Sequence, residues 1–297
     1  MSCTVDTFVP GPLVSTEWLA AQLGSPDVRI YDCTVIYGGG GEGGPEFPSG
    51  RPLYDKRHIP GAAFADLTTT LSIHDERDNW FTLPAPKALA EAAGALGIGD
   101  GHTVVLYDQG PSMWAARVWW QLRTIGFDAL VLDGGFKKWK AEGRPVSDEE
   151  TVHPPAVLTP RPRPELVASK ADVLALVQAG GGGSCLINSV SAVQHRGEGP
   201  ASGGRRPGHI PHSVNVPFDA VLDPETNAFL PPERLRELFA AQGAVAGTPV
   251  VAYCGGAIAA TNAALALELA GHGDVHVYDG SLREWAADPA LPLVTGD

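Results

Sequence analysis

Short apolar runs rich in valine and isoleucine alternate along the chain with longer stretches of helical pattern. In the second half the apolar runs predict strands at 185–188, 250–253 and 275–278, and the longer stretches predict helices at 169–179, 232–241 and 258–270. Strands that alternate with helices are typical of a parallel sheet covered by helices. In such sheets the functional site lies at the carboxyl ends of the strands, where helix N-termini converge. The pattern therefore predicts an α/β fold with its site at one sheet edge.

The chain contains an internal repeat, and three features of the first half return in the second. They are a His-Ile-Pro motif at His58 and His209, a strand that ends at Asp108 and Cys254, and an Asp-Gly pair followed by tryptophan at 133–139 and 279–285. The paired positions lie 146 to 151 residues apart. Several ordered matches at nearly one offset indicate two duplicated domains.

A proline-rich segment separates the two copies. Residues 143–165 contain six prolines and the charged run Asp148-Glu149-Glu150, which favours an extended linker over packed structure. We therefore expect a first domain over 1–146, a linker over 147–165 and a second domain over 166–297.

The charge balance limits the partners and the location. The chain has 34 acidic and 21 basic side chains and a formal net charge of −13, which argues against nucleic acid or an anionic membrane surface as the main partner. The richest apolar stretch, 257–271, contains Thr261, Asn262 and Glu268 and is too polar for a membrane span. The N-terminal residues do not fit a secretory signal, and four cysteines without a CxxC pair suit a reducing compartment. These features predict a cytoplasmic protein.

Cys254 is the cysteine whose place in the pattern suggests chemistry. It stands between the strand 250–253 and an alanine-rich helix, with Gly255 and Gly256 directly after it. Amide N–H groups and the positive end of a helix dipole at such a turn stabilise a thiolate, which is a nucleophile. The alternative is a small buried hydrophobic residue, the usual state of an intracellular cysteine. The position alone leaves both interpretations open, and for Cys3, Cys33 and Cys185 we keep the second.

These motifs resemble those of the two-domain sulfurtransferases of the rhodanese family, the thiosulfate and 3-mercaptopyruvate type. The resemblance rests on the two His-Ile-Pro motifs, the strand that ends in Cys254, the sequence Asp-Gly-Ser-Leu-Arg-Glu-Trp at 279–285, and, in the first copy, Arg117-Val118-Trp119-Trp120 with Asp133-Gly134-Gly135. It extends from about Ser15 to the end of the chain.

The resemblance implies two tandem rhodanese-like domains, each a parallel sheet flanked by helices. The first domain is then inactive, and Asp108 indeed stands where the second copy has Cys254. Cys254 would take a sulfane sulfur from thiosulfate or 3-mercaptopyruvate, hold it as a persulfide, and pass it to cyanide or a thiol, including that of a thioredoxin-like protein.

The same resemblance defines an active-site loop and implies that the reaction needs no cofactor. The loop comprises Gly255, Gly256, Ala257, Ile258, Ala259 and Ala260, whose backbone donors would stabilise both thiolate and persulfide. No metal or organic cofactor is expected. The glycine-rich stretches 38–44 and 180–183 lack the Lys-Ser/Thr ending of a phosphate loop and predict surface loops.

The loop departs from the family in ways that leave the sulfur donor open. Thiosulfate-specific relatives usually carry basic side chains after the cysteine, and mercaptopyruvate-specific ones a Gly-Ser-Gly-Val-Thr-like loop. Gly-Gly-Ala-Ile-Ala-Ala matches neither, and without a cation it favours a monoanionic donor such as mercaptopyruvate.

A second departure concerns the anion-binding residues. The family tends to place an aspartate at the end of the first strand of the catalytic domain and an arginine six residues later, where this chain has Asn188 and Gln194. The nearby basic side chains are Arg196, Arg205 and Arg206, and we expect at least one of them to bind the anionic end of the donor.

Two other functions compete with this one. A phosphatase of similar architecture needs an arginine six residues after the cysteine, and Ala260 stands there. A noncatalytic sulfur-sensing or protein-binding module is the stronger alternative, because membership of a family does not establish turnover. Since His58 and His209 occur in both copies, including the one without a nucleophile, we expect them to be structural. Trp114, Trp119 and Trp120 predict core packing and contact with the other domain.

Overall fold

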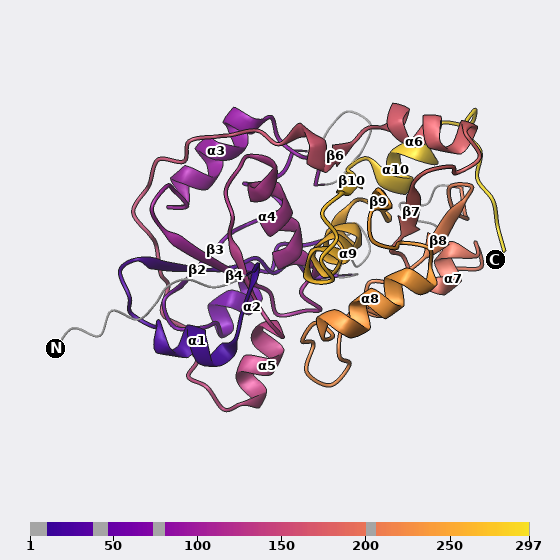
Figure 1. The fold of residues 1–297 in the computed structure, drawn as a ribbon. Coiled ribbons are helices and arrows are strands. Elements are labelled where there is room, and N and C mark those ends of the chain that lie inside the picture. The colour runs from indigo at the N-terminus through magenta and orange to yellow at the C-terminus, as the bar shows by residue number, and fades with distance from the viewer. Residues whose placement is uncertain (1–10, 38–46, 74–80, 200–205, 297) are drawn as a thin grey trace.

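The computed structural model describes residues 11–37, 47–73, 81–199 and 206–296, and these form two similar α/β domains (Figure 1). Each domain has one five-stranded sheet in which all strand pairs are parallel. The strand order is β1-β5-β4-β2-β3 in the first sheet and β6-β10-β9-β7-β8 in the second. The two orders correspond strand for strand, which confirms the expected pair of tandem domains with parallel sheets flanked by helices.

In the first domain strands and helices alternate as the sequence pattern predicts. Its strands are β1 (Leu13–Val14), β2 (Val28–Asp32), β3 (Ala62–Phe64), β4 (Thr103–Tyr107) and β5 (Leu130–Leu132). Its helices are α1 (Thr16–Ala21), α2 (Arg51–Lys56), α3 (Pro86–Ala95), α4 (Met113–Thr124) and α5 (Gly135–Ala141).

The second domain repeats this order. Its strands are β6 (Val167–Ala168), β7 (Cys185–Asn188), β8 (Ser213–Asn215), β9 (Val250–Tyr253) and β10 (Val275–Tyr278). Its helices are α6 (Lys170–Gln178), α7 (Ala192–His195), α8 (Pro232–Ala241), α9 (Ile258–Leu269) and α10 (Ser281–Trp285), preceded by a short 3-10 helix, Pro164–Leu166. The three predicted strands coincide with β7, β9 and β10, and the three predicted helices end within one residue of α6, α8 and α9.

Helices α4 and α9 pack against each other and join the two domains (Figure 1). Every residue of α4 except Arg123 is buried, as is typical of a helix enclosed on all sides. Apolar side chains of both helices belong to one continuous hydrophobic cluster that includes Trp114, Trp119 and Trp120. The expected role of these tryptophans in the core and at the domain interface is confirmed. Among the described residues no helix is long and apolar enough to cross a membrane.

Two reciprocal hydrogen bonds also connect the domains. The carboxylate of Asp133, after β5, accepts a bond of 2.8 Å from the N–H of Phe229 in the second domain. The carboxylate of Asp279, after β10, accepts one of 2.9 Å from the N–H of Leu83 in the first domain. Each residue of the second pair lies 146 positions from its counterpart in the first. The repeat in the sequence thus produces a pseudo-twofold interface.

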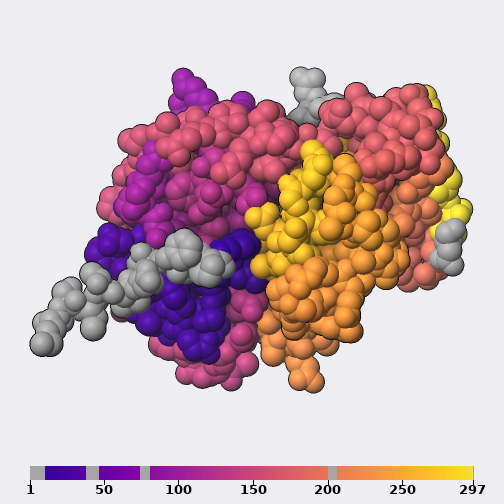
Figure 2. All heavy atoms as spheres, in the orientation of Figure 1, coloured from indigo at the N-terminus to yellow at the C-terminus, as the bar shows by residue number. Residues whose placement is uncertain are grey.

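The segment between the two sheets is extended, and it is packed against the first domain. Main-chain bonds join Ala156 to Gly94, Val157 to Asp100 and Arg161 to Ile125, at 2.9, 2.8 and 2.7 Å. A methyl group on Gly94 would lie 2.6 Å from the carbonyl oxygen of Ala156, so the absence of a side chain there permits the close approach. In Figure 2 the segment forms a continuous band over the first domain.

Candidate active site

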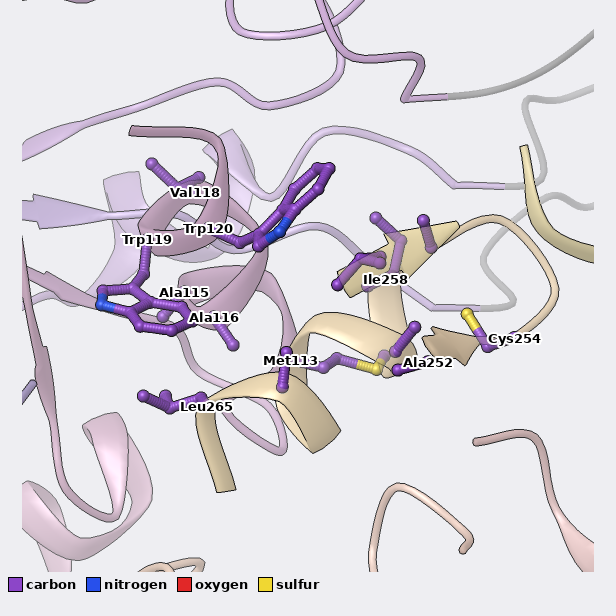
Figure 3. Close-up of a cluster of buried hydrophobic side chains, with 14 of the residues drawn as sticks. Met113, Ala115, Ala116, Val118, Trp119, Trp120, Ala252, Cys254, Ile258 and Leu265 are labelled. Carbon is purple, nitrogen blue, oxygen red and sulfur yellow. The ribbon is translucent and has the colours of Figure 1, made fainter. Parts of the chain in front are cut away.

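Cys254 lies at the carboxyl end of β9, a strand buried along its whole length. The residue is 3% exposed, and the chain turns sharply after it through Gly255 and Gly256 into α9. The turn is completed by Ala257, the residue before the helix, in the left-handed conformation with φ 60°. Figure 3 shows Cys254 beyond the end of β9, with Ile258 at the start of the helix that follows. The structure therefore places the predicted nucleophile at a strand-to-helix turn.

Ser281 fixes the shape of this turn from the neighbouring strand end. Its hydroxyl accepts hydrogen bonds from the N–H groups of Cys254 at 3.2 Å and Ala257 at 3.1 Å, and donates to the carbonyl of Tyr278 at 2.8 Å. The next two N–H groups, of Leu282 and Arg283, donate to the carbonyls of Cys254 and Gly255, both at 2.9 Å. The first turn of α10 thus holds the loop after Cys254 in place through these hydrogen bonds.

This role of Ser281 was not predicted from the sequence, although the residue belongs to the Asp-Gly-Ser motif at 279–281. The repeat contained the signal: the first copy, which has Asp108 instead of a cysteine at the strand end, has Gly135 at the position of Ser281. Both residues have a left-handed backbone, with φ 49° for Ser281 and 53° for Gly135. Ser281 therefore has a backbone conformation that suits glycine. A serine stands at this position only in the copy that has Cys254 at its strand end.

The beginning of α9 presents backbone donors to the loop. The first N–H groups of an α-helix have no acceptor within the helix, and no side chain caps this end of α9. The donors include the N–H groups of Ala259 and Ala260, where the positive end of the helix dipole also lies. This end of the helix can hydrogen-bond an anion, as expected for the loop of a thiolate or persulfide.

The first domain has a corresponding strand-to-helix loop, one residue longer, that encloses a carboxyl group. The side chain of Asp108, at the position of Cys254, is fully buried and accepts four backbone hydrogen bonds, from Gly110, Ser112, Trp114 and Ala115, at 2.8 to 3.1 Å. Burial raises the pKa of the Asp108 carboxyl, and the four bonds oppose that shift. Counted from the start of each helix, Trp114 and Ala115 correspond to Ala259 and Ala260. The loop fold is therefore suited to a small anion.

Two other cysteines lie in the described part of the chain, and both are buried thiols. Cys33 is fully enclosed beside Asp32, and burial raises its pKa well above the ordinary value. Burial also raises the pKa of Cys185. A raised pKa disfavours the reactive thiolate, so these residues match the structural role expected for them. Cys3 lies outside the described residues.

Asn188, where the family tends to have aspartate, stands at the end of β7 opposite Tyr253 in the sheet register. Its side-chain carbonyl accepts a bond from the N–H of Val190, and its amide nitrogen lies 3.1 Å from Nδ1 of His195. Gln194, at the position of the family's arginine, bonds to the Ser191 hydroxyl that caps α7. At the carboxyl end of β7, neutral amide side chains thus stand where the family tends to have an aspartate and an arginine.

The three arginines expected near the donor lie in different surroundings. Arg206 donates four hydrogen bonds to the carbonyls of Ala286, Asp288 and Leu291, which gives it a structural role at the C-terminal segment. Arg196 follows α7, is 32% exposed along its side chain and pairs with Glu198 at 3.0 Å. Arg205 lies outside the described residues.

The histidines of the two His-Ile-Pro motifs have matching structural contacts, as expected. Nδ1 of His58 lies 2.8 Å from the carbonyl of Tyr54, and Nδ1 of His209 lies 2.7 Å from that of His195. Each imidazole also stacks on the ring of the same partner residue, at 3.9 and 3.7 Å between centroids. No group of three or more potential metal ligands occurs within the described ranges.

Comparison with known proteins agrees with this geometry. The model of the rhodanese-like domain matches residues 15–142 and 204–288. The chain belongs to the rhodanese-like family. A probable 3-mercaptopyruvate sulfurtransferase of Pseudomonas aeruginosa is 36% identical, over 96% of this chain and 98% of the relative. Rat thiosulfate sulfurtransferase is 34% identical, over 92% and 91%.

A solved rhodanese structure shares the fold. The crystal structure of the 3-mercaptopyruvate sulfotransferase SseA from Escherichia coli matches with a TM-score of 0.79 and 27% identity, over 92% of this chain and 99% of that one. With sulfurtransferase relatives over nearly its whole length, this rhodanese is an enzyme of the sulfurtransferase type.

Proposed function

We propose that this rhodanese transfers sulfur through a persulfide on Cys254, from thiosulfate or 3-mercaptopyruvate to cyanide or a thiol, including that of a thioredoxin-like protein. The observation that supports this most directly is the pair of matched loops. One copy encloses the carboxylate of Asp108 with four N–H bonds, and the other has a cysteine at that position. A thiolate or persulfide is the anion that suits the second loop.

The first half-reaction forms one sulfur–sulfur bond and breaks one bond in the donor. The Cys254 thiolate attacks the outer sulfur of thiosulfate, and the electron pair of the broken bond leaves with sulfite. With 3-mercaptopyruvate the carbon–sulfur bond breaks, and the enolate that keeps the electron pair takes up the thiol proton to become pyruvate. In the second half-reaction a thiolate or cyanide attacks the outer sulfur and restores the Cys254 thiolate.

The residues around Cys254 have separate roles in this scheme. We assign the N–H groups of Ala259 and Ala260 to stabilise the negative sulfur, by analogy with Trp114 and Ala115, whose N–H groups donate to Asp108. The N–H groups of Cys254 and Ala257 instead bond to Ser281 and hold the turn in shape. Donors that are fixed before the reaction stabilise an anion without reorganisation during it.

The uncharged loop favours 3-mercaptopyruvate over thiosulfate. Residues 255–260 contain no cation to offset a thiosulfate dianion beside a thiolate. Two like charges about 4 Å apart repel by about 1 kcal/mol even in water, and by more in a less polar site. We assign the carboxylate of a monoanionic donor to Arg196, whose side chain is 32% exposed and pairs with Glu198 at the surface, whereas Arg206 holds main-chain carbonyls.

A panel of donors tests the proposal. The protein is mixed with each donor and analysed by peptide mass spectrometry, and we expect an increase of about 32 Da, one sulfur atom, on Cys254. The Cys254→Ser variant should show no adduct and no turnover. An adduct that mapped to Cys33 or Cys185 would contradict the assignment. Loading without repeated turnover would favour the sulfur-sensing alternative.

A further inference from the structure

Arg117 is a fully buried cation that crosses the domain interface. It lies in α4 of the first domain, and its guanidinium donates to the carboxylate of Asp279 in the second domain at 2.7 Å. The same nitrogen bonds to the carbonyl of Phe81, and the guanidinium carbon lies 4.8 Å from the ring centre of Trp120. Its Nε and Nη1 atoms have no hydrogen-bond partner among the described residues. Burial of a charge with so few partners is costly for the fold, which suggests a role beyond stability.

Asp279 connects this cation to the catalytic loop. It follows β10 directly and stands two residues before Ser281, whose hydroxyl holds the N–H groups of Cys254 and Ala257. The N–H groups of Leu282 and Arg283 hold the loop carbonyls. The segment that begins at Asp279 therefore makes four hydrogen bonds to the Cys254 turn. A shift of Asp279 would move every one of these bonds.

The cation is present on only one side of the pseudo-twofold interface. Asp133 and Asp279 are equivalent, and each accepts a main-chain bond from the opposite domain. In α9, however, the position equivalent to Arg117 is Asn262, whose amide donates to Phe218 of its own domain at 3.2 Å. A requirement of domain docking alone would apply to both sides. The arginine reaches only towards the domain that carries the cysteine.

We propose that Arg117 is a positioning residue of the active site, supplied by the domain that has no nucleophile. By anchoring Asp279 it sets the place of Ser281 and thereby the conformation of the Cys254 turn. This proposal rests on the role of Cys254 proposed above. It assigns the first domain an indirect part in sulfur transfer, through Asp279 and Ser281, so that the catalytic domain alone has an incomplete site.

Single-turnover persulfide formation at Cys254 tests this role. The wild type, Arg117→Met and Arg117→Lys are mixed with increasing donor, quenched, and analysed for the sulfur adduct. Misplacement of reacting groups by about 1 Å can cost about a hundredfold in rate, so we expect Arg117→Met to lower the limiting rate constant about ten- to a hundredfold. The donor concentration at half-saturation should change little, and Arg117→Lys should recover part of the rate.

Arg123→Met is the matched control. Arg123 lies on the same helix and also forms an ion pair across the interface, with Glu268 at 2.8 Å, but Glu268 stands at the C-terminal end of α9, opposite the end that begins at the catalytic loop. This variant should keep the wild-type rate. Unfolding curves for each variant establish that the measurement is made on folded protein.

The outcomes separate the two proposals. A folded Arg117→Met protein with the wild-type limiting rate, or an equal loss in Arg123→Met, would overturn the positioning role. If Arg117→Met does not fold, Asp279→Asn decides, because it keeps the shape and the acceptor atom while removing the charge; an unchanged rate would again overturn the role. A wild-type protein that formed no adduct on Cys254 would overturn the proposed function itself, and this inference with it.

Discussion

The hydroxyl of Ser281 accepts a hydrogen bond from the N–H of Cys254 at 3.2 Å, so the residue that carries the nucleophile is held by the end of the neighbouring strand. The same hydroxyl holds the N–H of Ala257, whose left-handed backbone completes the turn. One side chain thus connects both ends of the turn. Its removal should affect the geometry of the loop more than the stability of the domain.

We expect Ser281→Gly to lower kcat about tenfold and the free energy of unfolding by about 1 kcal/mol per lost hydrogen bond. Glycine is the appropriate replacement because the equivalent Gly135 has nearly the same backbone conformation. Steady-state kinetics and urea unfolding provide the two measurements. The matched control is Ser169→Ala, which removes the cap of α6 and should lower stability by about 1 kcal/mol without changing kcat. Equal effects on kcat in both variants would contradict the role of Ser281.

A second prediction transfers the arrangement of the first domain to the second. In Cys254→Asp the carboxylate should accept the N–H groups at the start of α9, as Asp108 does at the start of α4. A carboxylate at a helix N-terminus in a partly buried site contributes about 1 to 2 kcal/mol. We expect Cys254→Asp to be inactive and more stable to urea than Cys254→Asn by about that amount.

The comparison with Cys254→Asn separates charge from shape, since the two side chains have the same size. An aspartate variant that was no more stable than the asparagine variant would show that the second loop does not bind anions through its amides. The loop between Asp108 and α4 has one residue more than the loop between Cys254 and α9. This difference in length would then explain why the second loop does not bind the carboxylate.

Three strands and three helices of the second domain could be predicted from the sequence because the local apolar pattern and the repeat agreed, whereas the short elements β6, β8, α7 and α10 were not predicted. The repeat also located Cys254, since only the second copy has a thiol at the strand end. The site beyond Cys254 depends on contacts between distant segments. Ser281 is 27 residues from Cys254, and Arg117 is 162 residues from Asp279. No local pattern indicates which strand ends become neighbours, and Arg206 for the same reason could not be recognised as a residue that holds the C-terminal segment.

A third prediction distinguishes the two arginines, Arg196 and Arg206, that were expected to bind the donor and that the structure describes. Arg196→Ala should raise the KM for 3-mercaptopyruvate about ten- to a hundredfold, which corresponds to a charge-assisted hydrogen bond of about 1.5 to 3 kcal/mol. Arg196→Lys should recover only part of the loss, because lysine cannot bind a carboxylate in the bidentate manner of arginine.

Arg206→Ala serves as the control for Arg196. It removes four bonds to main-chain carbonyls and should lower the free energy of unfolding by about 2 kcal/mol or more, with little change in KM for the folded protein. If KM rose in Arg206→Ala and not in Arg196→Ala, the donor would lie against the other arginine.

The pKa values of the buried cysteines give a prediction about pH. Burial raises the pKa of Cys33 and Cys185, so both remain thiols at neutral pH and should react slowly with iodoacetamide. In a Cys3→Ser background at pH 7, we expect neither Cys33 nor Cys185 to be alkylated on the timescale of the experiment. Labelling of Cys185 should appear only as the pH rises beyond the ordinary thiol value of 9.0, because more thiolate then forms. Peptide mapping after timed labelling measures each site, and rapid labelling of Cys33 at pH 7 would be inconsistent with its burial.

The last prediction concerns the packed segment between the domains. Gly94 lies within α3, where alanine ordinarily stabilises a helix by about 1 kcal/mol relative to glycine. Here a methyl group would lie 2.6 Å from the carbonyl oxygen of Ala156. Ala156 cannot move away without loss of the hydrogen bond that its own N–H donates to the carbonyl of Gly94. We therefore expect Gly94→Ala to lower the free energy of unfolding by about 1 to 3 kcal/mol, the usual cost of forcing an extra methyl group into a packed contact.

Gly273→Ala is the control, because a methyl group there meets nothing within 4 Å, and it should leave stability within about 0.5 kcal/mol of the wild type. Urea unfolding of the two variants decides the matter: a stabilised Gly94→Ala protein would mean that the segment lifts away from α3 in solution and serves only as a tether.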